Sequence, residues 1–245
     1  MKKFMIMAAA VMVSLSVNAQ SSPEAKAIKK MKSYTEVLEA IKANGASFDK
    51  ADNAFAYNKL VDLAISENSK TEKAAIEAQL AKNAEQQAQM TNAKNAAAYN
   101  ALQAAMQCNA FDEKGKYKNK NVNRLMTIRN SMVQAGLDAY NTKDYESATK
   151  YFGAFVETRT DALFNEADFS REQNFGQIAY YAALAAYFNK DYAKCDQYAD
   201  AALNSSERDS IANDVIIVKL GAYEEQAKTA VMDSATYVTN VRAMY

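Results

Sequence analysis

Apolar residues recur at helical spacing along almost the whole chain from residue 22 onward. Ser22-Pro23-Glu24 gives a helix start with a cap, a first-position proline and a first-turn acid, and Asn44-Gly45 gives a stop. The same spacing predicts further helices at about 52–67, 70–107 with one or more breaks, 119–141, 144–158, 175–190, 191–205, 208–228 and 234–245. One Pro and six Gly are too few turn residues for a sandwich or barrel. We therefore expect an all-α fold, with the nearly all-apolar helix at 175–190 in a central place.

One segment of the chain is repeated. The copy that starts at Ala139 reads AYNTKDYESATKYFGAFV, and it aligns without a gap on AYFNKDYAKCDQYADAAL, which starts at Ala186, 47 residues later. In both copies the apolar residues keep the i, i+3, i+6, i+7, i+10, i+11 spacing of one helix face. An apolar helix precedes each copy, and Lys32-Ser33-Tyr34 begins a weaker third copy. Because a helix, turn, helix unit buries its apolar face only against neighbours, the repeat predicts stacked antiparallel hairpins.

The order of residues within each copy resembles a known family. A small residue in the first helix (Gly136, Ala183) is followed by Asp-Tyr at the turn, a small residue three positions later and then aromatic residues. This order resembles the tetratricopeptide repeat, and the chain is similar in particular to exported bacterial proteins with degenerate repeats of that kind. The resemblance implies an α-solenoid, and small residues at Gly136 and Ala183 let the second helix of each pair approach closely.

The copies also depart from that family in two ways. The proline expected at the end of each unit is Thr160 in one copy and Glu207 in the other. The spacing of 47 residues exceeds the family's length of roughly 34. We expect the extra residues to form a loop between repeats at 158–177.

Residues 1–19 predict a secretory signal peptide. Lys2 and Lys3 precede an apolar run of about fourteen residues, and Val17-Asn18-Ala19 places small residues where a signal peptidase cleaves. That run is shorter than the ~18 residues of a spanning helix, and an uncleaved anchor is the alternative. We expect an exported, periplasmic chain that starts at Gln20, with association at the outer membrane as a further possibility.

Two helical regions follow the leader. We assign 20–110 to an N-terminal helical region with a degenerate repeat and 119–245 to the repeat region that resembles tetratricopeptide repeats. The last predicted helix carries an apolar face, formed by Val238, Val241, Met244 and Tyr245. Repeat arrays need polar caps for solubility. We therefore expect either that the repeat region is incomplete at its C-terminus or that this helix mediates self-association.

The inventory of reactive side chains narrows the chemistry. The chain has no His, which excludes His-dependent triads and His-ligated zinc or haem. Its isolated glycines form no phosphate loop, and neither Cys has a second metal ligand nearby, so we expect no metal and no cofactor. Glu166, Asp168, Glu172 and the pair Glu224-Glu225 are the acids left for a carboxylate-dependent hydrolase. Scattered acids are usually solvated surface, so we expect a protein that is not an enzyme.

Net charge and cysteine content limit the classes of partner and the covalent links that we expect. The chain has 29 basic and 29 acidic side chains, which is not the footprint of a nucleic-acid-binding protein. The basic stretch 112–124 either joins two helical blocks as a solvated loop, which we favour, or contacts an anionic partner. Export would allow a disulfide between Cys108 and Cys195, but we favour two buried free thiols.

A candidate recognition surface follows from the first helix of each hairpin. In the family that the sequence resembles, this face lines a concave groove for a peptide or partner segment. Its apolar and aromatic positions are Val133, Leu137, Tyr140 and Asn141 in one copy and Tyr180, Leu184, Tyr187 and Phe188 in the other. Such a groove would suit an apolar or extended segment, with Tyr hydroxyls and Asn141 supplying polar contacts. The alternative is that these aromatics belong to the core.

The functional prediction is an exported scaffold that binds a protein or peptide partner across repeat hairpins. A second hypothesis is a glycan-binding helical protein at the outer membrane, which resembles the starch-binding lipoproteins. The absence of Trp and of a lipidated Cys counts against that second hypothesis.

Overall fold

The computed structural model describes residues 22–170, 172–229 and 232–243, and within these ranges the chain consists of helices and the segments that join them, with no strand. The prediction of an all-α fold built from stacked helix hairpins is confirmed. The helices are α1 (Pro23–Ile28), α2 (Tyr34–Asn44), α3 (Lys50–Leu80), α4 (Ala84–Phe111), α5 (Lys118–Asn141), α6 (Tyr145–Thr160), α7 (Phe175–Phe188), α8 (Tyr192–Leu203), α9 (Arg208–Lys228) and α10 (Ser234–Arg242). The segment 1–19 lies outside the described residues, and no helix of the described ranges is long and apolar enough to cross a membrane.

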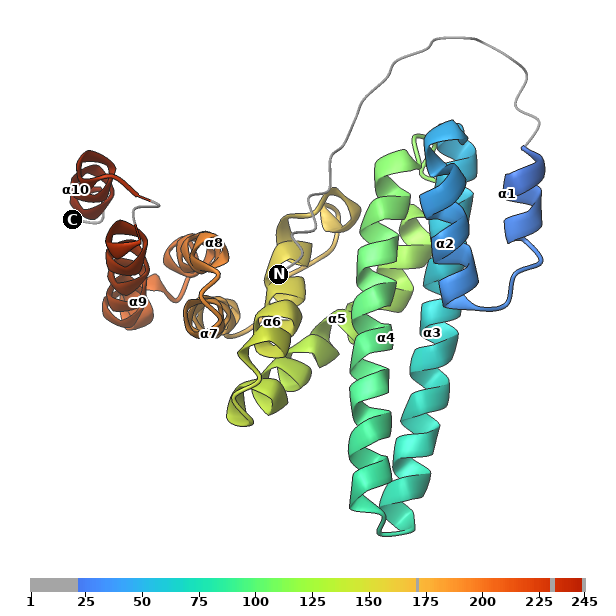
Figure 1. The fold of residues 1–245 in the computed structure, drawn as a ribbon, viewed down its shortest axis with the longest axis horizontal. Helices are drawn as coiled ribbons and strands as arrows, with labels where there is room; N and C mark the ends of the chain where they lie inside the picture. Colours follow the sequence, from blue (N-terminus) through green and yellow to red (C-terminus); the bar gives the residue numbers. More distant parts are fainter. Residues whose placement is uncertain (1–21, 171, 230–231, 244–245) are drawn as a thin grey trace.

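The N-terminal part of the fold is a long hairpin of α3 and α4. Figure 1 shows the two helices side by side, with α2 and α1 packed along one end and the connecting turn far from it. The helix break expected between 67 and 70 is absent. Asn68 instead donates its side-chain amide to the Lys94 carbonyl of α4 at 3.0 Å, and the Thr71 hydroxyl donates to the Glu67 carbonyl at 2.8 Å. Polar residues that looked like a stop in sequence are therefore held inside one continuous helix.

The following helices form a row of shorter hairpins. In Figure 1, α5 and α6 lie against the long hairpin, and α7–α8 and then α9 and α10 continue the row away from it. The helix α7 packs against α6, α8 and α9, which is the central place that its all-round apolar sequence predicts. One hydrophobic core runs from the long hairpin into this row.

The same turn closes three hairpins. Lys143 between α5 and α6, Lys190 between α7 and α8, and Lys82 between α3 and α4 all have φ close to +60°. In each turn the next residue donates its backbone N–H at 2.9 Å to a carbonyl five positions earlier, in Ala139, Ala186 and Ala78 respectively. This pattern is a Schellman motif, which satisfies the free carbonyls at a helix end.

A capping side chain completes each of these turns. Asp144, Asp191 and Asn83 accept a backbone N–H of the first turn of the next helix, at distances of 3.1, 3.2 and 3.1 Å. The long hairpin is therefore closed in the same way as the two sequence repeats. The weaker copy at Lys32-Ser33-Tyr34 differs, because its preceding helix α1 has only six residues and no residue between α1 and α2 has positive φ.

Two glycines set the spacing between helices of the row. A Cβ atom on Gly136 of α5 would lie 2.5 Å from the Phe152 ring of α6, and one on Gly153 of α6 would lie 2.2 Å from the Tyr198 hydroxyl of α8. The Tyr198 hydroxyl also donates to Glu157 at 2.6 Å, which ties α8 to α6. The first contact is the close approach within a hairpin expected at Gly136, and the second joins neighbouring hairpins.

Candidate functional site

The structure gathers the aromatic residues of both repeats into one band on the row of hairpins. Tyr140 of α5 lies edge-on to Tyr145 at 5.5 Å between ring centroids, and it meets Tyr181 and Phe188 of α7 at 6.1 and 6.4 Å. Phe188 in turn stacks on Tyr145 at 4.8 Å and lies 5.6 Å from Tyr187. The band therefore bridges the first helices of two neighbouring hairpins.

The predicted groove residues are neither core nor fully open. Six of the eight are partly buried, namely Val133, Leu137, Tyr140, Tyr180, Leu184 and Tyr187. Phe188 is 44% exposed, which is unusual for a side chain of its size, and Asn141 is also exposed. These residues thus expose apolar surface to solvent, while the buried part of each aromatic ring packs within the aromatic band.

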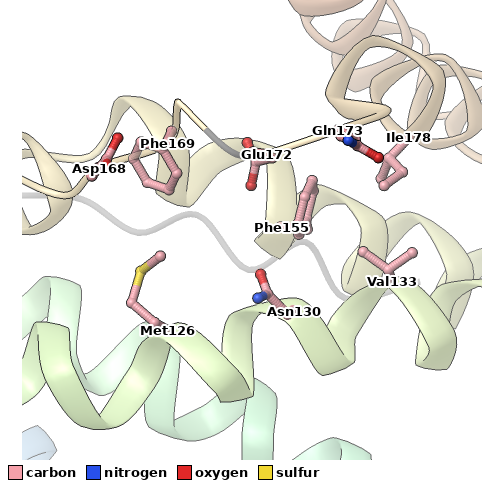
Figure 2. A pocket seen from close by; sticks show the side chains of 9 residues that line it. All are labelled: Met126, Asn130, Val133, Phe155, Asp168, Phe169, Glu172, Gln173 and Ile178. Carbon is pink, nitrogen blue, oxygen red and sulfur yellow. The ribbon is translucent and has the colours of Figure 1, made fainter.

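A hollow of about 370 Å³ opens between α5, α7 and the segment that joins α6 to α7. Figure 2 shows Met126, Asn130 and Val133 rising from α5 on one side of it. The joining segment supplies the opposite wall, with Asp168, Phe169, Glu172 and Gln173, while Phe155 and Ile178 come from α6 and α7. Of the predicted residues, Val133 belongs to this hollow.

The joining segment is held in place by a buried arginine. Arg129 of α5 is fully buried, and its guanidinium lies 3.9 Å from the Phe155 ring centroid and 4.8 Å from that of Phe169. It donates to Thr158 Oγ1 at 2.7 Å and to the Phe155 carbonyl at 3.0 Å, and it forms an ion pair with Glu172. All three nitrogens of the guanidinium thus have acceptors, which is the condition for burying a charge.

Glu172 bridges two arginines. Its second carboxylate oxygen pairs with Arg159 of α6, whose guanidinium stacks on Phe175 at 4.3 Å. Burial lowers the pKa of Arg129, while the charge of Glu172 opposes that shift. The loop expected at 158–177 is shorter in the structure, because α6 runs to Thr160 and α7 starts at Phe175. Glu172, near the α7 end of this segment, anchors it to the core through the two arginines.

A second hollow, of about 480 Å³, lies between α7 and α9. Leu184 and Tyr187 form its α7 wall, and α9 contributes apolar side chains that include Ile217, which is 66% exposed. The Tyr187 ring passes 3.2 Å from the position of a Cβ on Gly221, so the helices are close at this point. We call the residues of the two hollows and of the aromatic band, which come mainly from α5, α7 and α9, the hairpin face.

The acids proposed for catalysis are mostly committed to other contacts. Glu166 pairs with Lys118 at 2.7 Å, and Glu225 pairs with Lys228 at 2.7 Å. Asp168 and Glu172 both line the first hollow, but Glu172 is shared by two arginines. Hydrogen bonds from Ser170 lower the pKa of Asp168, whereas a general acid needs a raised one.

No group of acids and thiols in the described ranges is arranged to hold a metal ion. Cys108 in α4 and Cys195 in α8 are both free and fully buried. Burial raises the pKa of each thiol to about 12, so both are held as the unreactive protonated form.

The basic stretch at 112–124 is largely paired within the molecule. Most of it is the first turns of α5, and the loop itself covers only 112–117. Lys120 and Arg124 both form ion pairs with Asp62 of α3. This stretch therefore fixes α5 against the long hairpin.

Sequence reasoning missed several residues of the hairpin face. Tyr181 and Tyr145 belong to the aromatic band, and Ile217 carries the most exposed apolar surface of its α9 wall. The signal for Tyr181 was present, because it lies one helical turn before Leu184 and Ala185 on the side of α7 that faces α6. From sequence, Ile217 could have been identified only through the weak similarity of α9 to the first helix of a repeat.

Comparisons with known proteins give no relative: no family model, no curated protein and no solved structure matches the chain.

Proposed function

We propose that the chain is an exported scaffold whose hairpin face binds an apolar, extended segment of a protein or peptide partner. The observation that carries the proposal is that the hairpin face combines two hollows with large exposed apolar side chains, Ile217 in the wall of the second hollow and Phe188 beside Tyr187 of the same wall. Large exposed apolar side chains that gather at a hollowed surface are typical of interaction sites. The resemblance of the hairpins to tetratricopeptide repeats supports the same use of this face.

The lining of the hairpin face suits such a partner. Each hollow is within the ~300–1,000 Å³ that ligand pockets usually occupy, and their walls are mostly apolar. Asn130 and Gln173 at the first hollow and Glu224 at the second offer polar contacts to a partner's backbone. Apolar side chains would anchor the segment while these groups fix its register.

Export and location belong to the same proposal. The pattern of residues 1–19 supports secretion, and a periplasmic scaffold would meet its partner there or in a complex at the outer membrane. Binding at the hairpin face does not depend on this location.

The experiment selects binding peptides from a random display library on the full chain and measures their affinities for variants. Phe188→Ser and Ile217→Ser should each weaken the selected peptides by about tenfold or more, as truncation of a buried anchor does. Ile76→Ser, at a residue that is 52% exposed on α3, is the matched control and should leave affinity unchanged. Equal affinities for all three variants, or no selected peptide, would contradict the proposal.

These variants separate binding from folding better than changes to the central tyrosines do. Tyr140 contacts three other rings, so Tyr140→Ala would disturb the stack as well as the surface. Ile217 is 66% exposed, so Ile217→Ser should leave the helical circular dichroism unchanged. Phe188 also meets three rings, but it is 44% exposed, whereas Tyr140 is partly buried, so Phe188→Ser should remove part of the stack without unfolding the row, and circular dichroism checks this.

A further inference from the structure

The second hollow of the hairpin face has an acid at each end. Its α9 wall follows one stripe of the helix, because Asp214, Ile217, Gly221 and Glu224 are spaced three, four and three residues apart. The last three of these residues line the hollow. Asp214 lies beyond it, near Tyr180 of α7, whose pKa is raised by burial and further by the charge of Asp214. The apolar middle of the stripe is thus flanked by two carboxylates.

Both of these acids are available to a partner. Asp214 and Glu224 are exposed, and within the described residues neither forms an ion pair or a side-chain hydrogen bond. The lysines of the same helix have other partners. Lys219 is buried and pairs with two acids of α8, and Lys228 pairs with Glu225 at 2.7 Å. No Lys or Arg is among the residues that line the hollow, so the stripe keeps both negative charges.

The separation of the two acids sets the spacing of a complementary partner. Positions 214 and 224 lie about 15 Å apart along the helix axis, at ~1.5 Å per residue. An extended segment advances ~3.3 Å per residue, so its residues four positions apart are about 13 Å from each other. The first, third and fifth side chains of such a segment point to the same side. Two basic side chains four positions apart would therefore face the acids, with one apolar side chain between them at the hollow.

We propose that the second hollow binds an extended segment of a partner protein with the pattern basic, any residue, apolar, any residue, basic. This inference rests on the function proposed above and specifies the chemistry of the partner. The carboxylates of Asp214 and Glu224 pair with the Lys or Arg side chains of the segment. The rings of Tyr180 and Tyr187, close to these acids, suit the same cations. Ile217 packs against the apolar side chain, and an acidic segment is repelled.

The experiment is the sequencing of the peptides that a random display library yields on the full chain at low ionic strength. Peptides that lose affinity for Ile217→Ser should carry Lys or Arg two positions before and two positions after an apolar residue more often than the unselected library does. Peptides that depend on Ile217 without this enrichment, or with Asp or Glu at those positions, would overturn this inference and leave the proposed function standing. A library without any peptide that depends on Ile217 would contradict both.

Charge-removing variants test whether the two acids meet the basic side chains. Asp214→Asn and Glu224→Gln keep the side-chain shape at exposed sites, so the fold should persist. Each should weaken a synthetic copy of the most enriched basic peptide by about two- to fivefold in isothermal titration, the size of an exposed ion pair. The loss should shrink as salt is added.

Two controls separate this effect from a change in overall charge. Glu77→Gln removes an exposed acid of the long hairpin and should leave the affinity unchanged. A copy of the peptide with Gln in place of each basic residue should bind the full chain and both acid variants equally. An equal loss with Glu77→Gln, or unchanged affinity of the basic peptide for both Asp214→Asn and Glu224→Gln, would overturn the inference.

Discussion

The long hairpin of α3 and α4 and the row of hairpins from α5 to α9 use the same turn but meet solvent differently. The far half of the long hairpin has few neighbours: Ile76 is 52% exposed and Leu80 is 79% exposed. In the row, each hairpin contacts the next one, and aromatic side chains such as Phe152 and Tyr198 are fully buried between helices. The two regions therefore share the same turn, but they differ in how much of their apolar surface neighbouring helices cover.

Helix length accounts for this difference. The helices α3 and α4 have 31 and 28 residues, whereas α7 and α8 have 14 and 12. At 1.5 Å per residue, the far part of the long hairpin extends beyond the reach of its neighbours. Its sequence there is rich in Ala, Gln, Glu and Lys, which form helix without requiring burial. The comparison teaches that the turn sets the antiparallel direction of the second helix, whereas helix length decides which side chains neighbouring helices bury.

The largest expected effect is at the buried arginine of the row. Glu172→Ala leaves Arg129 with an uncompensated charge at a fully buried site, so the variant should lose about 3–5 kcal/mol of unfolding free energy. Chemical denaturation followed by circular dichroism measures the loss. Glu166→Ala is the control in the same segment, because its ion pair with Lys118 is largely exposed and should contribute less than about 1 kcal/mol. Similar losses in both variants would contradict the anchoring role of Glu172.

A pair of leucines tests the two ends of the long hairpin. Leu60 is 1% exposed near α2, and Leu60→Ala should cost about 2–5 kcal/mol through lost burial and a cavity. Leu80→Ala at the exposed far end should change the unfolding free energy by less than about 0.5 kcal/mol. Thermal and denaturant unfolding of both variants measures this contrast. A large cost at Leu80 would show that the far end is covered in solution.

The next largest loss of stability is expected at the glycines that set the spacing between helices of the row. Gly136→Ala and Gly153→Ala place a methyl group against the Phe152 ring and the Tyr198 hydroxyl, and each should cost about 1–3 kcal/mol. Gly221→Ala is the matched helical control, because its nearest neighbour is the partly buried Tyr187 ring at 3.2 Å, a looser contact than the other two, and this ring borders the second hollow. That control should be neutral or gain up to about 1 kcal/mol from helix propensity. Equal behaviour of the three variants would argue against tight stacking.

Alkaline pH should weaken both regions through their buried thiols. Cys108 in the long hairpin and Cys195 in the row have pKa values raised to about 12, so the unfolded chain loses these protons at lower pH than the folded one. Stability is therefore complete below the unfolded thiol pKa and falls between about pH 9 and 12, by ~1.4 kcal/mol per pH unit for each thiol. Cys195→Ala should reduce the slope of unfolding free energy against pH in this window. An unchanged slope would contradict the protonated, buried state.

Sequence reasoning predicted the elements better than the contacts between them. The repeat located the turns at Asp144 and Asp191, because helix spacing and capping are local. The third turn is a break of the kind expected within 70–107, but its position was not predicted, although Lys82-Asn83 has the same Lys-Asn/Asp pair as Lys143-Asp144 and Lys190-Asp191. Its flanking helices lack the aromatic pattern that marked the repeat.

The candidate surface was predictable only in part. Val133, Leu137 and Leu184 could be placed on one face from spacing, but the wall opposite Val133 depends on Glu172 meeting Arg129, 43 residues earlier in the chain. Nothing in local pattern indicates such a pair.

The most direct test of the central claim is hydroxyl-radical footprinting of the full chain with and without a library-selected peptide. The account predicts that oxidation of Phe188 and Ile217 on the hairpin face falls when the peptide binds, while oxidation of Ile76 and Leu80 on the long hairpin stays the same. Protection of Ile76 and Leu80 with Phe188 and Ile217 unchanged would contradict it and move the binding surface to the long hairpin.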